Sequence, residues 1–371
     1  MPNDAHPGID VADPWAAIEA CYERGWTDGL PVVPPTVPLV ERMLAGGPWA
    51  ADEALLHEPV RGRDVTAWTA AINAVMAGCR PEYFAVVGAA LQAIGDPAFL
   101  LHGPATSTGG AAIMVIVNGP ARARLGFNAK GNLFGPGVRA NATIGRAVRL
   151  VLLNALGCVP GVLDKSTQGW AGKYTLCFAE DEESSPWEPL HCSRGVAQER
   201  SAVTVFAAES GHNVLSHAGR TPEQVLAAVA DAMAGLSSLS PGRSVVVLAP
   251  EHAARLRAGG WSRPRTQQWL YDHARRTLAD FKRGAKLERE LAASEAGRAW
   301  LYAHAPAGWS PDDPEQIGPG DDRVWVHRGL GPDDILLAVG GGDAGGHSAF
   351  FPSWSRGRSV PFVTREVPDH E

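Results

Sequence analysis

Two stretches of the chain share one order of predicted elements, and this order limits the fold more than any single motif. One runs from PEYFAVVGAALQAI (81–94) into MVIVNGPARARLG (114–126), the other from PEQVLAAVADAMAGL (222–236) into VVVLAPEHAARLRAGG (245–260). In each, a helix precedes a buried strand, a proline-containing turn, a short helix and a long helix. We therefore predict an α/β fold of two similar, duplicated halves packed around a central cleft, where a ligand would bind.

The expected organisation is an N-terminal helix with a proline-rich extended segment (1–64), a first α/β half (65–200) and a second α/β half (201–371). The four prolines of WTDGLPVVPPTVP (26–38) exclude a helix there. Hydrophobic and helical periodicity predicts the remaining elements. Helices are predicted over 65–79, 81–94, 142–157, 221–236, 263–284 and 286–306, and strands over 111–120, 172–180, 201–213, 243–250 and 334–354.

Composition excludes several classes of protein. A formal net charge of -7 and a pI near 6.0 argue against nucleic acid as the main partner. The apolar run at 111–117 is far shorter than the ~20 residues that span a bilayer, and the N-terminus lacks the pattern of a signal peptide. Five cysteines without a CxxC motif argue against disulfides and structural zinc. We expect a cytoplasmic protein without a membrane partner.

Polar side chains follow the ends of several predicted strands. Asn118 ends the first core strand, and Glu180 and Glu183 lie in the acidic run that ends the next. Clustered carboxylates raise one another's pKa, so Glu180, Glu183 and Glu188 are candidate general bases. Trp187 lies between them in the sequence and would desolvate a carboxylate. The alternative is a solvated acidic turn.

Histidines beside these carboxylates allow a metal site. His191 and His212, with Glu180 or Glu209, offer the imidazole and carboxylate groups that suit zinc, iron or manganese. No HExxH or HxH motif is present, so acid–base chemistry without a divalent metal is the alternative. Cys192, next to His191, is the best placed of the thiols to act as a nucleophile.

Arginines and a glycine-rich loop indicate anion binding. Arg139 and Arg146 flank Asn141 at the start of a predicted helix, as in a carboxylate or phosphate clamp, and surface salt bridges are the alternative. His102 precedes a Ser/Thr/Gly loop whose N–H groups would bind an anion, unless the loop only connects two elements. GNLFGPG lacks the GK[ST] of a P-loop, and GGGDAGG precedes no helix, so no nucleotide cofactor is expected.

Four long motifs resemble a largely uncharacterised bacterial family associated with UGSC-motif selenoproteins: GWTDGLPVVPPT (25–36), VIVNGPARARLGFN (115–128), FGPGVRANATIGRAVRLVLLN (134–154) and GKYTLCFAEDEESSPWEPLH (172–191). The resemblance extends to about residue 347, with Cys158 where glycine is expected and Gly211 where proline is expected. It implies functional roles for Asp28, Asn118, Arg139, Asn141, Arg146, Lys173, Glu180, Glu183, Trp187, Glu188, His191, His212 and Asn213. The chain has no UGSC or CGSC motif, so a redox-active thiol partner would be a separate small protein.

These observations predict an enzyme, a lyase or hydrolase, that acts on a small anionic metabolite. Arg139 and Arg146 would hold the anion, Glu180 or Glu183 would act as the base, and His212 as the acid or a metal ligand. His102, Asn118, Asn141, Lys173, Trp187 and Asn213 would help to bind the substrate. The alternatives are an incomplete subunit that works with a thiol-bearing partner, or a ligand-binding module without turnover. We also expect a homo-oligomer.

Overall fold

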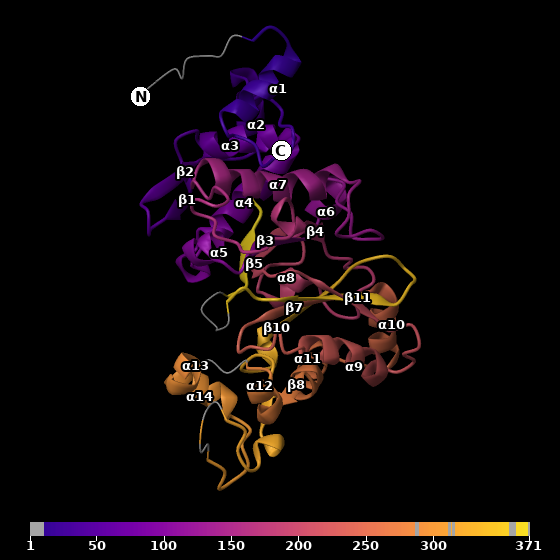
Figure 1. Ribbon diagram of the computed structural model, residues 1–371. Helices are drawn as coiled ribbons and strands as arrows, with labels where there is room; N and C mark the ends of the chain where they lie inside the picture. Colours follow the sequence, from indigo (N-terminus) through magenta and orange to yellow (C-terminus); the bar gives the residue numbers. More distant parts are fainter. Residues whose placement is uncertain (1–10, 286–288, 311–312, 314–315, 356–360, 370–371) are drawn as a thin grey trace.

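Two four-stranded mixed sheets, with helices packed around them, form the framework of the described residues in the computed structural model (Figure 1). These residues are 11–285, 289–310, 313, 316–355 and 361–369. The arrangement confirms the predicted α/β class. Within the described part of the chain, no helix is both long and apolar enough to cross a membrane.

The first sheet has the strand order β12-β5-β3-β4. β3 runs parallel to β4 and antiparallel to β5, and β12 pairs antiparallel with the other side of β5. All of β4 and β5 is buried, as expected for strands covered on both faces. The bounds are β3 (Ala112–Asn118), β4 (Cys177–Ala179), β5 (Ala202–Ala208) and β12 (Val363–Glu366).

The second sheet has the strand order β10-β7-β11-β6. β7 runs parallel to β10 and antiparallel to β11, and β6 pairs antiparallel with the other side of β11. The bounds are β6 (His212–Leu215), β7 (Ser244–Leu248), β10 (Ile335–Val339) and β11 (His347–Pro352).

Edge strands are exchanged between the two sheets. β6 follows β5 in the chain but pairs in the second sheet, and β12 follows β11 but pairs in the first. In Figure 1 the yellow C-terminal segment accordingly returns from the lower to the upper part of the molecule. The predicted boundary at residue 200 assigns β5 and β12 to the second half, whereas both lie in the first sheet. Apolar β5 forms a full ladder with β3, a long-range pairing that local sequence patterns do not specify.

Side chains of both sheets pack into one shared apolar cluster. Phe178 and Phe206 of the first sheet belong to the same cluster as Val247 and Phe351 of the second. Phe134 packs edge-on against both Phe178 and Phe351, at 5.2 Å between ring centroids in each case. Dense packing therefore joins the two sheets at this point, and the central cleft stays a prediction.

Helices of the first half follow the predicted ranges closely. α3 (Ala67–Ala77) begins at the N-cap Thr66 and ends at Gly78, whose φ of 85° is left-handed and suits glycine. α4 (Phe84–Ile94) is almost entirely buried and packs against β1 and β5. α7 (Arg139–Asn154) starts three residues before the predicted helix and packs against α3.

The N-terminal segment contains α1 (Pro14–Glu23), α2 (Val37–Leu44), β1 (Ala54–Glu58) and β2 (Arg63–Thr66). Residues 26–36 between α1 and α2 are not helical, as predicted from their prolines, but the prediction is wrong at 37–38, because α2 begins at Val37 and accepts Pro38 in its first turn. β1 and β2 form an antiparallel pair that the sequence analysis did not predict.

The second half holds α9 (Pro222–Met233), α10 (Pro250–Ala258) and α11 (Arg263–His273). The long helix predicted over 263–284 is wrong at its centre. There, β8 (Arg275–Thr277) pairs with β9 (Trp325–His327), and Thr277 then caps a separate α12 (Leu278–Arg283). A partner strand some fifty residues later, which helical periodicity does not reveal, interrupts the helix.

Short elements complete the described chain. The predicted strand over 172–180 is reduced to β4, because residues 171–173 form a 3-10 turn. The helix predicted over 286–306 begins outside the described residues and is divided at Ser294, the N-cap of α14. The remaining short α-helices are α5 (His102–Thr106), α6 (Ala121–Arg124), α8 (Leu190–Ser193), α13 (Arg289–Ala293) and α14 (Glu295–Leu301). Short 3-10 helices lie at Pro81–Tyr83, Pro97–Phe99, Ala171–Lys173, Asp321–Arg323 and Pro332–Asp334.

Candidate functional site

An acidic cluster lies at the carboxyl ends of the parallel strands β3 and β4. Asn118 donates from Nδ2 to Oε2 of Glu180 (2.6 Å) and to Oε1 of Glu182 (3.0 Å). Leu190 N–H also donates to Glu180 Oε2 (2.7 Å), and Gly119 N–H donates to Glu182 Oε1 (2.7 Å). Gly119 has a φ of 80°, and a Cβ there would lie 2.3 Å from the Arg200 carbonyl oxygen, so this close approach requires glycine.

Arg122 joins the rest of the acidic run. Its guanidinium donates to Glu182 Oε2 (2.8 Å), to both carboxylate oxygens of Glu183 (2.9 and 3.2 Å) and to the Glu180 carbonyl (2.9 Å). Asp181 is buried, binds Lys130 at 2.7 Å and donates its N–H to the Val339 carbonyl at the end of β10. The run therefore joins the first sheet to the second.

Burial and ion pairing shift the pKa values of two of these carboxyl groups in opposite directions. Burial raises the pKa of Glu180, despite the opposing hydrogen bond from Leu190 N–H and the charge of Arg263. The hydrogen bond from Arg122 lowers the pKa of Glu183 to about 2, against a smaller opposing effect of burial. The expected rise in pKa is thus found for Glu180, where burial contributes more than repulsion from neighbouring carboxylates. The pKa of Glu183 shifts downward, opposite to the direction expected of a general base.

His191 is the imidazole that the fold brings to this cluster. It is fully buried, with Nδ1 3.9 Å from Glu182 Oε1 and Nε2 3.7 Å from the Cys192 sulfur. Burial raises the pKa of Cys192, which disfavours an activated thiolate. Glu180, Asn118 and His191 are all fully buried, so these three side chains present no open face to a substrate.

Trp187 and Glu188 belong to the contact between the two halves. Trp187 donates from Nε1 to the Trp261 carbonyl (2.9 Å) and packs on the core formed by β7, β10, α9 and α11. The guanidinium of Arg263 lies 5.1 Å from the Trp187 ring centroid and donates to the Glu188 carbonyl (2.7 Å). Glu188 itself is exposed.

His212 and Asn213 lie on β6, at the other edge of the second sheet. His212 pairs with Phe350, which is in register with Val246 and then Leu337 of β10. Three strand spacings of about 4.8 Å place His212 roughly 14 Å from the edge that contacts the acidic run. Asn213 Nδ2 lies 3.1 Å from His347 Nδ1. The predicted pairing of Glu180 with His212 is therefore not formed.

The predicted metal site receives no support from this geometry. Among the described residues, no three His, Cys, Asp or Glu side chains are grouped so as to hold a metal ion. His191 lies against Glu182, His212 is three strands away, and the Glu209 N–H donates to the Pro352 carbonyl at the end of β11. Hence the residues proposed as ligands do not fit zinc, iron or manganese.

Arg139, Asn141 and Arg146 make contacts within the protein that account for their positions. Arg146 forms a two-point ion pair with Asp28 (2.7 and 2.9 Å) and also donates to the Leu30 and Pro31 carbonyls. Arg139 donates to the Gly78 carbonyl (2.9 Å). Asn141 bonds to the backbone of Asn128 in both directions (2.8 and 2.9 Å). Arg146 thus anchors the proline-rich segment to α7.

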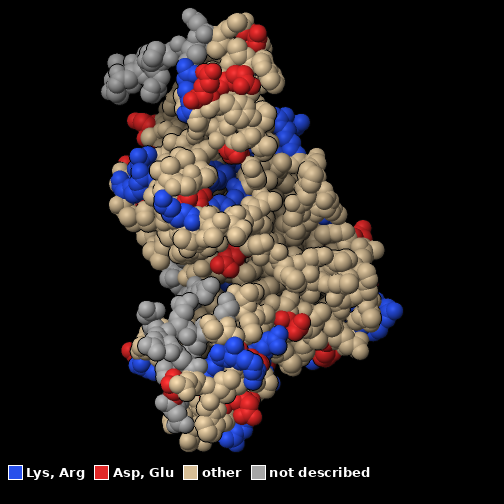
Figure 2. All heavy atoms as spheres, in the orientation of Figure 1, with Lys and Arg blue, Asp and Glu red and all other residues tan. Residues whose placement is uncertain are grey.

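A basic pocket lies at the opposite end of β3, about 20 Å from the acidic cluster at ~3.3 Å per residue. It comprises about 280 Å³ of empty space that includes open solvent, of which about 20 Å³ admits the centre of a water-sized sphere. In Figure 2, basic atoms lie recessed in a hollow of the upper part of the molecule, with acidic atoms beside them. The residues that line this basic pocket are Ala111, Ala112, Ile113, Gly145, Val148, Arg149, Leu152, Gly172, Lys173 and Leu176.

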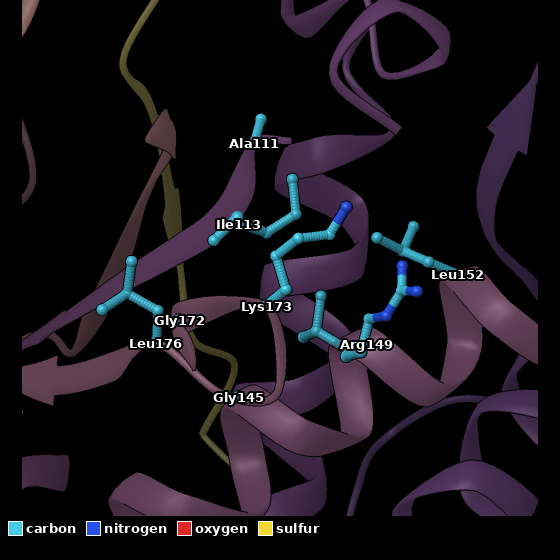
Figure 3. Close-up of a pocket in the computed structure, with 10 residues that line it drawn as sticks. Ala111, Ile113, Gly145, Arg149, Leu152, Gly172, Lys173 and Leu176 are labelled. Atoms are coloured by element: carbon cyan, nitrogen blue, oxygen red, sulfur yellow. The ribbon is translucent and has the colours of Figure 1, made fainter. Parts of the chain in front are cut away.

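One buried carboxylate joins the charged side chains of the basic pocket. Lys173 Nζ donates to both oxygens of Asp164 (2.7 and 2.9 Å) and to Ser166 Oγ (2.5 Å), and Ser166 Oγ donates to Asp164 Oδ1 (2.5 Å). Arg149 Nη2 lies 3.3 Å from Asp164 Oδ2 and 3.4 Å from the Cys158 carbonyl. Figure 3 shows the Lys173 and Arg149 side chains extending to the same side of the pocket.

The electrostatics of this group favour anions. Burial would raise the pKa of Asp164, but hydrogen bonds from Lys173 and Ser166 outweigh it and lower the pKa below its usual value. Asp164 is therefore an anion at neutral pH, and it lies between two cations. The group of Lys173, Arg149 and Asp164 carries a net charge of +1, which a bound anion would neutralise.

The loop after His102 lies next to this group. The N–H groups of Lys165 and Thr167 donate to the carbonyls of Thr106 and Thr108 (3.2 and 2.9 Å), so the two loops run side by side. His102 Nδ1 lies 3.6 Å from Glu58 Oε1. The loop thus helps to hold Asp164 and Ser166 in place.

Sequence reasoning found Lys173 but missed its partners Asp164, Ser166 and Arg149. A carboxylate, a hydroxyl and an ammonium within ten residues, in DKSTQGWAGK (164–173), were a signal that could have found them.

No protein-family model, curated protein or solved structure matches this chain. The resemblance to the UGSC-associated family therefore stays a prediction. The same holds for a thiol-bearing partner and for a homo-oligomer.

Proposed function

We propose that this protein is an enzyme that acts on a small anionic metabolite bound in the basic pocket, by lyase- or hydrolase-type chemistry. The observation that supports it is that Lys173, which lines the pocket, directly contacts Ser166 and the buried Asp164. Titratable groups that are coupled to a specific partner and lie at a pocket are typical of functional sites.

Each group has a role in this proposal. The Lys173 ammonium, helped by Arg149, stabilises negative charge that develops on the substrate in the transition state. Ser166 Oγ hydrogen-bonds to the substrate, and the ionised Asp164 holds Ser166 and Lys173 in position.

The proposal keeps Lys173 in substrate binding but moves the chemistry away from Glu180, Glu183 and His212. Glu180 has no open face, Glu183 is paired with Arg122, and His212 is three strands away. The acidic cluster is better suited to joining the two sheets.

We also propose that the two sheets descend from a duplicated α/β unit. In each, a parallel pair (β3 and β4, or β7 and β10) has an antiparallel third strand on one side, followed by an antiparallel edge strand. The mutual exchange of β6 and β12 supports a relation between the halves.

A turnover screen tests the enzymatic proposal. Small carboxylates, esters and amides would be incubated with the protein, and products detected by proton NMR. We expect Lys173→Met and Ser166→Ala to lower kcat/KM at least 100-fold, because each removes a group that contacts the reacting atoms. Lys165→Met, which removes an exposed neighbouring ammonium, should leave turnover unchanged. Equal turnover in Lys173→Met and the wild type would refute the proposal.

A further inference from the structure

The lining of the basic pocket is divided into an apolar part and a charged part. Ile113, Val148, Leu152 and Leu176 supply aliphatic side chains, and Ala111 and Ala112 continue this surface. The only ionisable residues among the ten that line it are Arg149 and Lys173. In Figure 3 their charged ends lie together, with Ile113 and Leu152 on either side. A ligand matched to this surface has one charged end and one apolar end.

Arg149 has further hydrogen-bond donors for the charged end of a ligand. Its Nη2 binds Asp164 and the Cys158 carbonyl, whereas Nε and Nη1 make no hydrogen bond to any described residue. The three donor positions of Lys173 are directed at Asp164 and Ser166. A planar guanidinium with free donors recognises a carboxylate by paired hydrogen bonds. The net charge of +1 matches a monoanion better than a dianion.

Pocket size sets the length of the ligand. The empty space of about 280 Å³ includes open solvent. Only about 20 Å³ of it is open to the centre of a water-sized sphere, so the enclosed part accepts only a small ligand. The apolar walls offer no hydrogen bonds to a sugar ring or a polyol.

We infer that the ligand of the basic pocket is a short-chain aliphatic monocarboxylate or its direct acyl derivative. The carboxylate would bind Arg149 beside Lys173, and the alkyl chain would lie against Ile113, Leu152 and Leu176. This inference rests on the proposed function, because it names the substrate class of the same site.

Isothermal titration calorimetry with the full-length protein tests it. The probes are the sodium salts of acetate, propionate, butyrate, valerate and hexanoate, with succinate and inorganic phosphate for comparison. We expect affinity to rise about four-fold for each added methylene until the chain outgrows the pocket. Tighter binding of phosphate or succinate than of butyrate, or no binding of any monocarboxylate, would overturn the inference.

Two variants test the apolar and the charged part of the pocket lining separately. Ile113→Trp should fill the apolar wall, so acetate still binds but the gain with chain length is lost. Arg149→Gln should weaken every carboxylate at least ten-fold, while Lys165→Met should not. If Arg149→Gln does not fold, the Ile113→Trp result alone decides, because unchanged chain-length dependence there contradicts the inference.

The outcomes also distinguish this inference from the proposed function. Chain-length-dependent binding without any turnover would support the ligand class and contradict the enzymatic proposal. Turnover of a polar dianion, abolished in Lys173→Met, would support the enzyme and contradict the ligand class.

Discussion

Single residues of the acidic cluster show how burial decides the state of a carboxyl group. Glu180 accepts two hydrogen bonds at Oε2, while Oε1 and Asn118 Oδ1 are buried acceptors without a hydrogen-bond partner among the described residues. A proton on Glu180 reduces the cost of burying its charge, in keeping with the raised pKa. Such a group stabilises the folded state most at low pH, and this contribution is lost as pH rises through its folded pKa.

Glu180→Gln should remove this pH dependence. The amide keeps an acceptor for Asn118 and Leu190, places a donor where Oε1 had no partner, and carries no charge at any pH. We expect the unfolding free energy of the variant, relative to wild type, to rise between about pH 4.3 and the raised folded pKa. Urea unfolding at pH 4.5 to 8 measures it. A constant difference across this range would contradict a raised pKa.

Glu183→Gln is the matched control, because the pKa of Glu183 is shifted in the opposite direction. Its pKa of about 2 places the loss of its stabilising contribution at more acidic pH. The difference from wild type should therefore be flat between pH 5 and 8. Because Glu183 is exposed, the effect should also be small.

At the scale of elements, one ion pair holds the proline-rich segment to α7. Asp28 and Arg146 are largely shielded from solvent, and Arg146 also binds the carbonyls of residues 30 and 31. Asp28→Ala leaves a shielded cation without its partner, at a cost of about 3 kcal/mol. Hydrogen exchange should accelerate in residues 26–36 and stay unchanged in β3. Asp13→Ala, which removes only the exposed N-cap of α1, should leave residues 26–36 protected.

Sequence periodicity predicted the elements whose pattern is local. α3, α4, α7 and α9 lie within a few residues of their predicted ranges, because caps such as Thr66 and Thr221 are encoded nearby. Periodicity failed where a distant segment determines the secondary structure. One case is β8, which forms a strand because β9 pairs with it. The candidate site shows the same limit, since Arg149 meets Asp164 only after the chain leaves α7 and turns back.

At the scale of the whole molecule, exchanged strands and a shared apolar cluster couple the two sheets. Phe362, next to β12, is buried in that cluster and lies 5.2 Å from the Phe206 ring of the first sheet. The Arg243 guanidinium, just before β7 of the second sheet, lies 5.8 Å from the Phe362 ring centroid. One side chain therefore contacts both halves.

This coupling predicts that the protein unfolds as one unit. Phe362→Ala should lower stability by about 3–5 kcal/mol, through lost burial and the cavity it leaves. Since both sheets share that loss, calorimetry should show a single transition, moved to lower temperature. Trp15→Ala, at an exposed position of α1, should leave the transition in place. Two transitions, of which only one moves, would instead mean that the sheets fold as separate domains despite their exchanged strands.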